Sequence, residues 1–117
     1  MSLTIATRQK LFGLLELDVE GRVLYSRIDS GTDARNFEGD IRGLNFFTEV
    51  APFENTGELQ QHVDDFRLGS QQANTISFTC QYGDGPVQVR VLMARIRERS
   101  ENDHTKSILV HIRKIGE

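Results

Sequence analysis

The chain has 117 residues, a formal net charge of −3 and a single cysteine, Cys80. The acidic balance argues against a nucleic-acid partner, one cysteine excludes both a disulfide framework and a thiolate zinc cluster, and no apolar run approaches the roughly 18 residues of a membrane helix. Without a secretory signal the default location is the cytoplasm. We expect one domain over 1–117, with residues 1–10 as an N-terminal extension whose first three residues resemble an expression scar, and a core at 11–115.

The N-terminal part is predicted to form a β-hairpin. Residues 11–17 are nearly all apolar, which is typical of a strand that is covered on both faces. A turn over 18–21 ends in glycine, and residues 22–28 alternate as the return strand. From 29 to 44 the pattern breaks into polar residues and glycines, so we expect short helical turns there. A further helical piece is predicted over 46–50.

The strongest helical signal follows Pro52. Leu59, Val63 and Phe66 recur on one face of a helix. Asn55 or the next residue is expected to cap its first turn. Gly69 is expected just beyond its end, in the position that favours a left-handed glycine.

Three strands are predicted in the C-terminal half. Apolar residues alternate with polar ones over 76–82 and 87–93, on either side of a turn at 83–86. A polar loop then leads to a last strand at 108–112. Hairpins at both ends around a helical middle predict an α+β fold, with an antiparallel sheet and helices packed on one face. The first strand should lie beside the last, where both of its faces are covered.

This order of elements, together with one segment, resembles the PAS domains of the photoactive yellow protein family. The segment is Asn-Phe-Phe at 45–47 followed by Val-Ala-Pro at 50–52, and scattered matches run from 12 to 94 and again from 107 to 115. The resemblance implies a five-stranded antiparallel sheet with a small pocket under its helices. It also implies a cytoplasmic sensor module of a bacterial signalling protein.

In that family a p-coumaroyl chromophore is attached as a thioester to a cysteine directly after Val-Ala-Pro, and the corresponding residue here is Phe53. The tyrosine and glutamate that hold the phenolate correspond to Ser26 and Ser30, and the nearby threonine and arginine to Ala34 and Asn36. A phenyl ring offers no nucleophile for a thioester. The resemblance therefore carries over the fold but not the photochemistry.

We expect a non-catalytic sensory or protein-interaction module without a cofactor or metal. The alternative is a sensor for a small apolar, aromatic or haem-like ligand that binds near Phe53. A phenylalanine in this place can line such a pocket or simply fill the core, and core filling is the stronger interpretation. The candidates for pocket residues are Ser26, Ser30, Ala34, Phe46, Phe53 and Met93.

The remaining reactive or charged side chains have simpler interpretations. Cys80 lies in an alternating apolar row and is expected to be a buried, inert thiol. His62, His104 and His111 have no neighbours at metal-ligand spacing. Glu16, the charged residue of the first strand, is expected to be exposed and to face a partner. The late basic residues are expected to point mostly to solvent: Arg90, Arg95, Arg97, Arg99, Arg113 and Lys114.

The outer face of the sheet, opposite the helices, is the expected partner surface. Only about ten residues precede the first strand. An apolar patch would stay partly open if residues such as Phe12, Leu14 and Leu109 faced outward, and such a patch usually marks an interface. We expect a homodimer or a neighbouring signalling domain on this face, and neither a nucleic acid nor a membrane.

Overall fold

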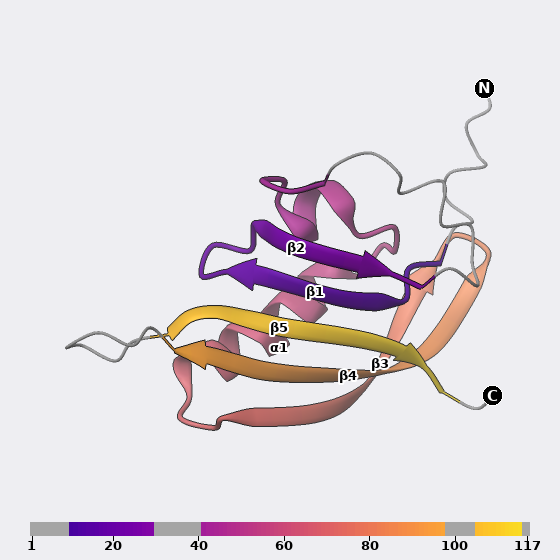
Figure 1. Ribbon diagram of the computed structural model, residues 1–117. Helices are drawn as coiled ribbons and strands as arrows, with labels where there is room; N and C mark the ends of the chain where they lie inside the picture. The colour runs from indigo at the N-terminus through magenta and orange to yellow at the C-terminus, as the bar shows by residue number, and fades with distance from the viewer. Residues whose placement is uncertain (1–9, 30–40, 98–104, 116–117) are drawn as a thin grey trace.

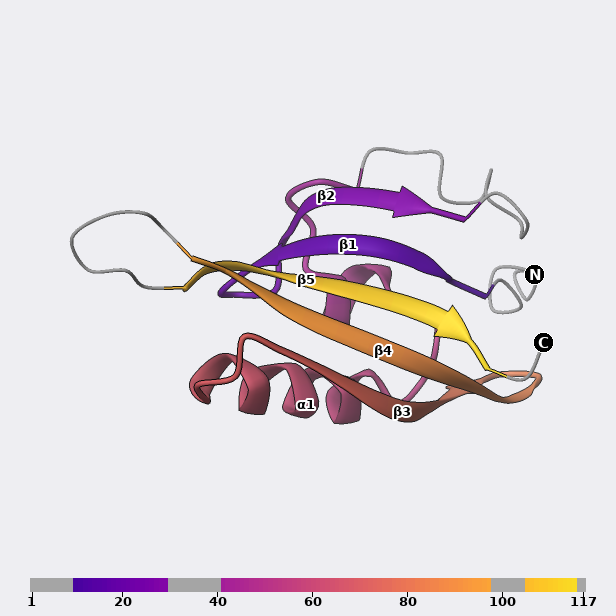
Figure 2. The same ribbon diagram turned by 60° about the horizontal axis from the view of Figure 1, so that its bottom comes forward.

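The structure is a computed structural model that describes residues 10–29, 41–97 and 105–115. Five antiparallel strands lie in the order β2-β1-β5-β4-β3, and the helical segments η3 and α1 cover one face of this sheet (Figures 1 and 2). The elements are β1 (Gly13–Asp18), β2 (Val23–Ile28), η3 (Phe46–Val50), α1 (Thr56–Leu68), β3 (Ala73–Tyr82), β4 (Gly85–Arg97) and β5 (Thr105–Lys114). The predicted α+β fold is confirmed.

Strand β1 lies between β2 and β5, as its apolar sequence predicted. Leu15 and Leu17 face the helices and are fully buried, opposite Val110 and Ile108 of β5. Leu14 on the other face is half-buried. A strand that is paired on both edges and packed under the helices on its inward face has little exposed surface, and this explains the nearly continuous apolar run.

Helix α1 places its predicted apolar face against the core, where Leu59, Val63 and Phe66 are buried. The helix begins after Asn55 and ends before Gly69, as predicted, but the two caps differ in detail from the expectation. Asn55 is the N-cap residue but makes no capping hydrogen bond with its side chain, because its side-chain amide hydrogen-bonds to β3 instead. Gly69 is extended, with φ −86°, so it is not a left-handed glycine.

Arg95 corrects the expectation that the late arginines point to solvent. It shares the inward phase of Val91 and Met93 on β4 and is only 5% exposed. Burial lowers the pKa of its guanidinium, and the charge of Arg97 adds to this effect. No carboxylate within the described residues pairs with Arg95, and its charge faces the carbonyl end of α1 instead.

The Arg95 guanidinium donates five hydrogen bonds. Three accepting carbonyls belong to the end of α1 and to Gly69, a fourth to the following loop, and the fifth acceptor is a hydroxyl at the start of β5. The acceptors are the oxygens of Phe66 (2.6 Å), Arg67 (3.1 Å), Gly69 (3.1 Å) and Gln71 (3.0 Å), and Oγ1 of Thr105 (2.7 Å). The end of α1 is therefore held on the sheet by one buried side chain.

Candidate functional site

The Phe46–Phe47 pair is positioned by a reciprocal cap around Asn45. The Asn45 side-chain oxygen accepts hydrogen bonds from the amides of Phe47 and Thr48, at 3.0 and 3.2 Å. The Glu49 carboxylate accepts the amide of Asn45 at 2.8 Å. Both phenyl rings are consequently turned into the core, where they meet edge to face with centroids 5.3 Å apart.

Gly21 permits the close approach of this segment to the β1–β2 turn. Its φ of +90° lies in the region that disfavours side chains, and a Cβ here would stand 3.2 Å from the ring of Phe47. The side-chain amide nitrogen of Asn45 donates a hydrogen bond to the carbonyl of Glu20 at 3.1 Å. The turn and η3 therefore form one packed unit.

Phe53 lies directly after Pro52 and is 4% exposed. Its ring packs against Tyr82 and Phe78 of β3, with centroid separations of 5.7 and 6.2 Å. Asn55 holds this segment in place, because its side chain donates to the carbonyl of Thr79 at 2.8 Å and accepts the amide of Gln81 at 2.9 Å. Phe53 is thus fixed on β3 by contacts of its ring and of its neighbours.

Tyr82 links Phe53 to the beginning of the described chain. The phenol oxygen of Tyr82 accepts a hydrogen bond from the Leu11 amide at 3.0 Å. The Lys10 ammonium lies 4.8 Å from the centre of the tyrosine ring and 2.9 Å from the Asp84 carboxylate. Burial raises the pKa of Tyr82 to about 12, so the phenol stays protonated well into the alkaline range.

The structure brings part of the predicted pocket set into one core. Phe46, Phe53 and Met93 are at most 4% exposed and belong to the same buried cluster. Ser26 is half-buried on the inward side of β2, opposite Leu15. Ser30 and Ala34 lie outside the described residues, as does Asn36. A pocket around these residues stays a prediction.

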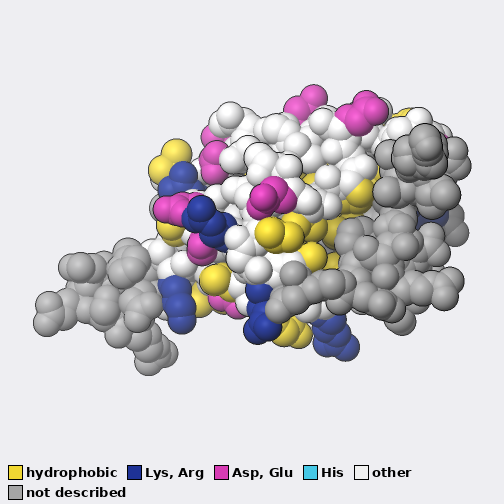
Figure 3. Space-filling model, turned by 90° about the horizontal axis from the view of Figure 1, so that it is seen from above, with side chains coloured by type: hydrophobic (Ala, Val, Ile, Leu, Met, Phe, Trp, Pro, Cys, Tyr) yellow, Lys and Arg dark blue, Asp and Glu magenta, His cyan; other side chains and the backbone are white. Residues whose placement is uncertain are grey.

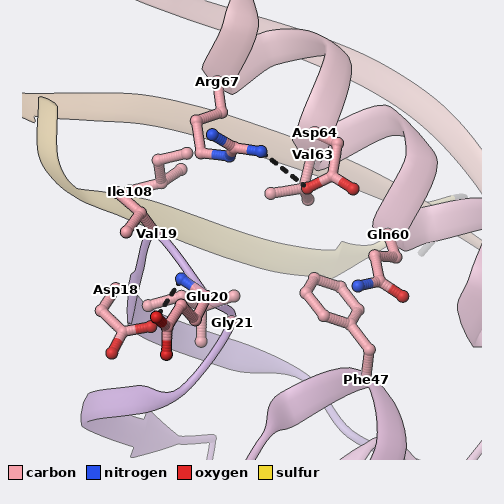
Figure 4. A pocket seen from close by; sticks show the side chains of 11 residues that line it. Asp18, Val19, Glu20, Gly21, Phe47, Gln60, Val63, Asp64, Arg67 and Ile108 are labelled. Carbon is pink, nitrogen blue, oxygen red and sulfur yellow. Dashed lines mark hydrogen bonds and ion pairs between the residues drawn. The ribbon is translucent and has the colours of Figure 1, made fainter.

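A hollow that the sequence did not suggest lies between the β1–β2 turn and α1, with a volume of about 330 Å³ (Figure 4). Val63 and Phe47 form part of its apolar wall. The Arg67 guanidinium lies 3.8 Å from the Asp64 carboxylate, and its Nε is buried without a hydrogen-bond partner. Asp64 and Arg67 are three residues apart on α1, a spacing that indicates a side-chain pair but does not by itself indicate a hollow.

Asp18 lines the same hollow, but its carboxylate is already engaged in the turn. It accepts hydrogen bonds from the amides of Glu20 and Arg22, both at 2.9 Å. The side chains of Glu20 and Arg22 form an ion pair with each other. The acidic groups at this end of the hollow therefore stabilise the hairpin.

Cys80, His62 and His111 occupy the places that the sequence suggested. Cys80 is 1% exposed, and burial raises its thiol pKa to about 12. His62 is exposed with its ring 5.9 Å from that of Phe78, and His111 lies on the outer face of β5, while His104 is outside the described residues. Within residues 10–29, 41–97 and 105–115, no group of three His, Cys, Asp or Glu side chains could hold a metal ion.

Glu16 differs from its expected exposed position. It is half-buried on the outer face of β1, and its carboxylate accepts the hydroxyl of Ser107 at 2.6 Å. In the part of the chain that the structure describes, no helix is long and apolar enough to cross a membrane.

The antiparallel five-stranded sheet with helical segments on one face has the PAS arrangement. No family model matches the chain. It is, however, 31% identical over 88 residues to photoactive yellow protein of Halochromatium salexigens, an alignment that covers 74% of this chain and 70% of the relative. The chain belongs to the photoactive yellow protein family.

Proposed function

We propose that this protein is a cytoplasmic, non-catalytic PAS-type sensory or protein-interaction module of a bacterial signalling protein, without a covalent p-coumaroyl chromophore. Phe53 carries the proposal, because it follows Val-Ala-Pro where the resemblance places the thioester cysteine. Its ring is buried against Phe78 and Tyr82 and offers no atom that a p-coumaroyl group could acylate. Phe53 supplies apolar contact at this position in place of an attachment point.

Cys80 is a poor substitute for the absent cysteine. A thiol reacts as its thiolate, and a pKa of about 12 leaves almost none of it at neutral pH. The thiol is also inaccessible, since the residue is 1% exposed within the inward row of β3. These properties support a module without covalent chemistry at its cysteine.

The proposed signalling route runs from Phe53 through Tyr82 to the Leu11 amide. Phe53 contacts the edge of the Tyr82 ring, and the phenol of that tyrosine accepts the backbone N–H of Leu11. A partner that shifts segment 29–55 against the sheet would change the packing of Phe53, and two further contacts lead from there to the chain before β1. Such a shift works by changing the populations of two packing states.

The alternative, a sensor for a small apolar or haem-like ligand near Phe53, has less support. Phe46, Phe53 and Met93 are buried in one cluster, and three hollows lined by described residues are found elsewhere. None of these three is lined by Ser26 or by any of the three cluster members.

The test is incubation of the native protein with the thiophenyl ester of p-coumaric acid, followed by intact-mass measurement. We expect no hydroxylamine-sensitive adduct and no new absorption band, and Cys80→Ala should behave identically. Unfolding in urea should expose Cys80 and allow its acylation, which shows that the reagent is active. A stable thioester on the native chain, with a visible band, would contradict the proposal.

A further inference from the structure

The outer face of the sheet has an apolar centre in the described residues. Strand register places side chains from β1, β2, β4 and β5 on this face, away from α1. Tyr25 is 47% exposed and Leu92 is 40% exposed, while Phe12 is buried and does not contribute. The half-buried members of the apolar centre are Leu14, Ala94, Ile96 and Leu109.

Three exposed arginines surround this centre. Arg90 of β4 lies directly opposite Arg113 of β5, and Arg27 of β2 lies opposite Leu14. No carboxylate of the described residues pairs with Arg90 or Arg113, whereas Glu16 on the same face is occupied by Ser107. Figure 3 shows the sheet from its β2 edge, with Lys and Arg side chains beside hydrophobic ones along the lower border, which is the outer face.

Two like charges placed directly opposite each other on neighbouring strands destabilise a sheet. The Arg90–Arg113 pair therefore brings a cost to the isolated domain that an acidic partner would remove. Beside Arg27, a hollow of about 220 Å³ lined also by Leu14, Asp29 and His111 offers room for one protruding side chain. Arg90 and Arg113 beside the apolar centre therefore suit a ligand that carries both apolar and acidic groups, whereas Asp29 gives the hollow beside Arg27 a mixed charge.

From this charge pattern we propose that the outer face binds an acidic amphipathic helix of a partner protein. Its apolar side would lie on Leu92 and Leu109, and its carboxylates would reach Arg90 and Arg113. The proposal deepens the interaction role stated above and rests on it. Residues 1–9 contain no Asp or Glu, so they do not supply the complementary charge.

A second copy fits this face less well than an acidic segment does. Stacking two outer faces about a twofold axis would enclose both arginine sets in one interface, and juxtaposed like charges there are costly. A nucleic acid fits less well too, because the apolar centre would lie against a phosphate backbone and the whole chain carries −3.

The test uses a fluorescein-labelled helical peptide of leucines and glutamates, with the Leu residues on one face, and a second peptide with lysines in place of the glutamates. Binding is followed by fluorescence anisotropy. We expect the acidic peptide to bind, the basic one to bind at least about tenfold more weakly, and affinity to fall as salt rises. Leu92→Asp should also weaken binding.

Charge reversal at one position provides a matched control. Arg113→Glu should weaken the acidic peptide about tenfold, whereas Lys114→Glu should change its affinity less than about twofold. Lys114 is exposed and adjacent, but it lies opposite Val89 on the inward register and so points away from the outer face. The milder Arg113→Gln, checked by circular dichroism, separates lost binding from lost folding.

Equal effects of Arg113→Glu and Lys114→Glu would overturn the proposal, as would equal binding of the two peptides. Single-stranded RNA that binds where the acidic peptide does not would identify a phosphate-binding face instead. A dimer in sedimentation experiments that Leu92→Asp dissociates would identify a second copy as the occupant. None of these results depends on p-coumaroyl acylation, so this inference and the absence of a chromophore can fail separately.

Discussion

Replacing Arg95 with methionine tests how the end of α1 is held on the sheet. The substitution keeps an unbranched apolar stem and removes all five hydrogen bonds of the guanidinium. The carbonyls of Gly69 and Gln71 lie in exposed residues and can turn to water, as can the hydroxyl of Thr105. The carbonyl of Arg67, a half-buried residue, loses its side-chain partner, whereas that of Phe66 keeps the amide of Gly69 at 3.2 Å.

An unsatisfied buried carbonyl costs roughly 1–3 kcal/mol, so the loss at Arg67, with a smaller loss at Phe66, places the cost of Arg95→Met at about 2 kcal/mol. The mutant also escapes the desolvation cost of the buried guanidinium, and this relief keeps the net loss below the upper end of that range. Arg95→Lys keeps the charge but has a shorter reach and three donors, and it should lose about half as much. The free energy of unfolding is measured by urea denaturation followed by far-ultraviolet circular dichroism.

Arg97→Met is the matched control, because Arg97 is exposed and makes one long hydrogen bond, 3.4 Å to Gln72. It should change the free energy of unfolding by less than about 0.5 kcal/mol. Amide exchange at Gly69, whose N–H donates to Asp65 and Phe66, should quicken in Arg95→Met and not in the control. Equal stability of the two methionine variants would refute the structural role of Arg95.

Two further predictions concern the aromatic contacts of β3. Phe53→Ala should lower the free energy of unfolding by about 3–5 kcal/mol in urea denaturation, because it opens a cavity beside Phe78 and Tyr82. The control is Leu68→Ala, at a site that is 73% exposed, which should lower the free energy of unfolding by less than about 0.5 kcal/mol. Equal losses in the two variants would show that Phe53 is not packed. The second concerns alkaline pH. The pKa of Cys80 rises from 9.0 to about 12 and that of Tyr82 from 10.0 to about 12 on folding, so both groups keep their protons more tightly when folded. Their contribution is fully present below pH 9 and is lost as the pH rises toward 12. Unfolding free energies measured from pH 8 to 11.5 should therefore fall, and the fall should be smaller in Cys80→Ala and Tyr82→Phe; an unchanged slope in both variants would contradict the burial of these groups.

Local patterns were sufficient for the architecture. The nearly continuous apolar run of residues 11–17, interrupted by Glu16, predicted neighbouring strands on both edges of β1, because a strand with so few polar residues is typical of the middle of a sheet. The stripe of Leu59, Val63 and Phe66 predicted the buried face of α1, since helical periodicity and burial coincide there. Both signals come from residues that are close in sequence and are buried in the same part of the core.

Long-range hydrogen bonds account for the features that the sequence did not predict. Asn55 binds β3 backbone groups 24 and 26 residues away, and these compete with the helix cap that its position suggested. Arg95 binds the carbonyl of Phe66 at a separation of 29 residues. Its alternation with Val91 and Met93 did point inward, but the acceptors that make such burial tolerable come together only in the folded chain.

The candidate site could be predicted in position more readily than in shape. The Val-Ala-Pro segment located Phe53, and the structure then showed its ring against Tyr82 and Phe78. The Tyr82 contacts with Lys10 and Leu11 had no sequence signal, because they join residues about seventy positions apart.

Acylation of a Phe53→Cys variant tests most directly the central claim that Phe53 occupies the chromophore position of this family and prevents covalent attachment. The variant is made in a Cys80→Ala background, so that position 53 carries the sole thiol, and it is treated in its native state with the thiophenyl ester of p-coumaric acid. We predict one hydroxylamine-sensitive p-coumaroyl group on Phe53→Cys and none on the parent. The claim would be contradicted if the Cys80→Ala parent, which keeps Phe53, were acylated to the same extent. It would also be contradicted if the native Phe53→Cys variant stayed unmodified while its urea-unfolded form reacted.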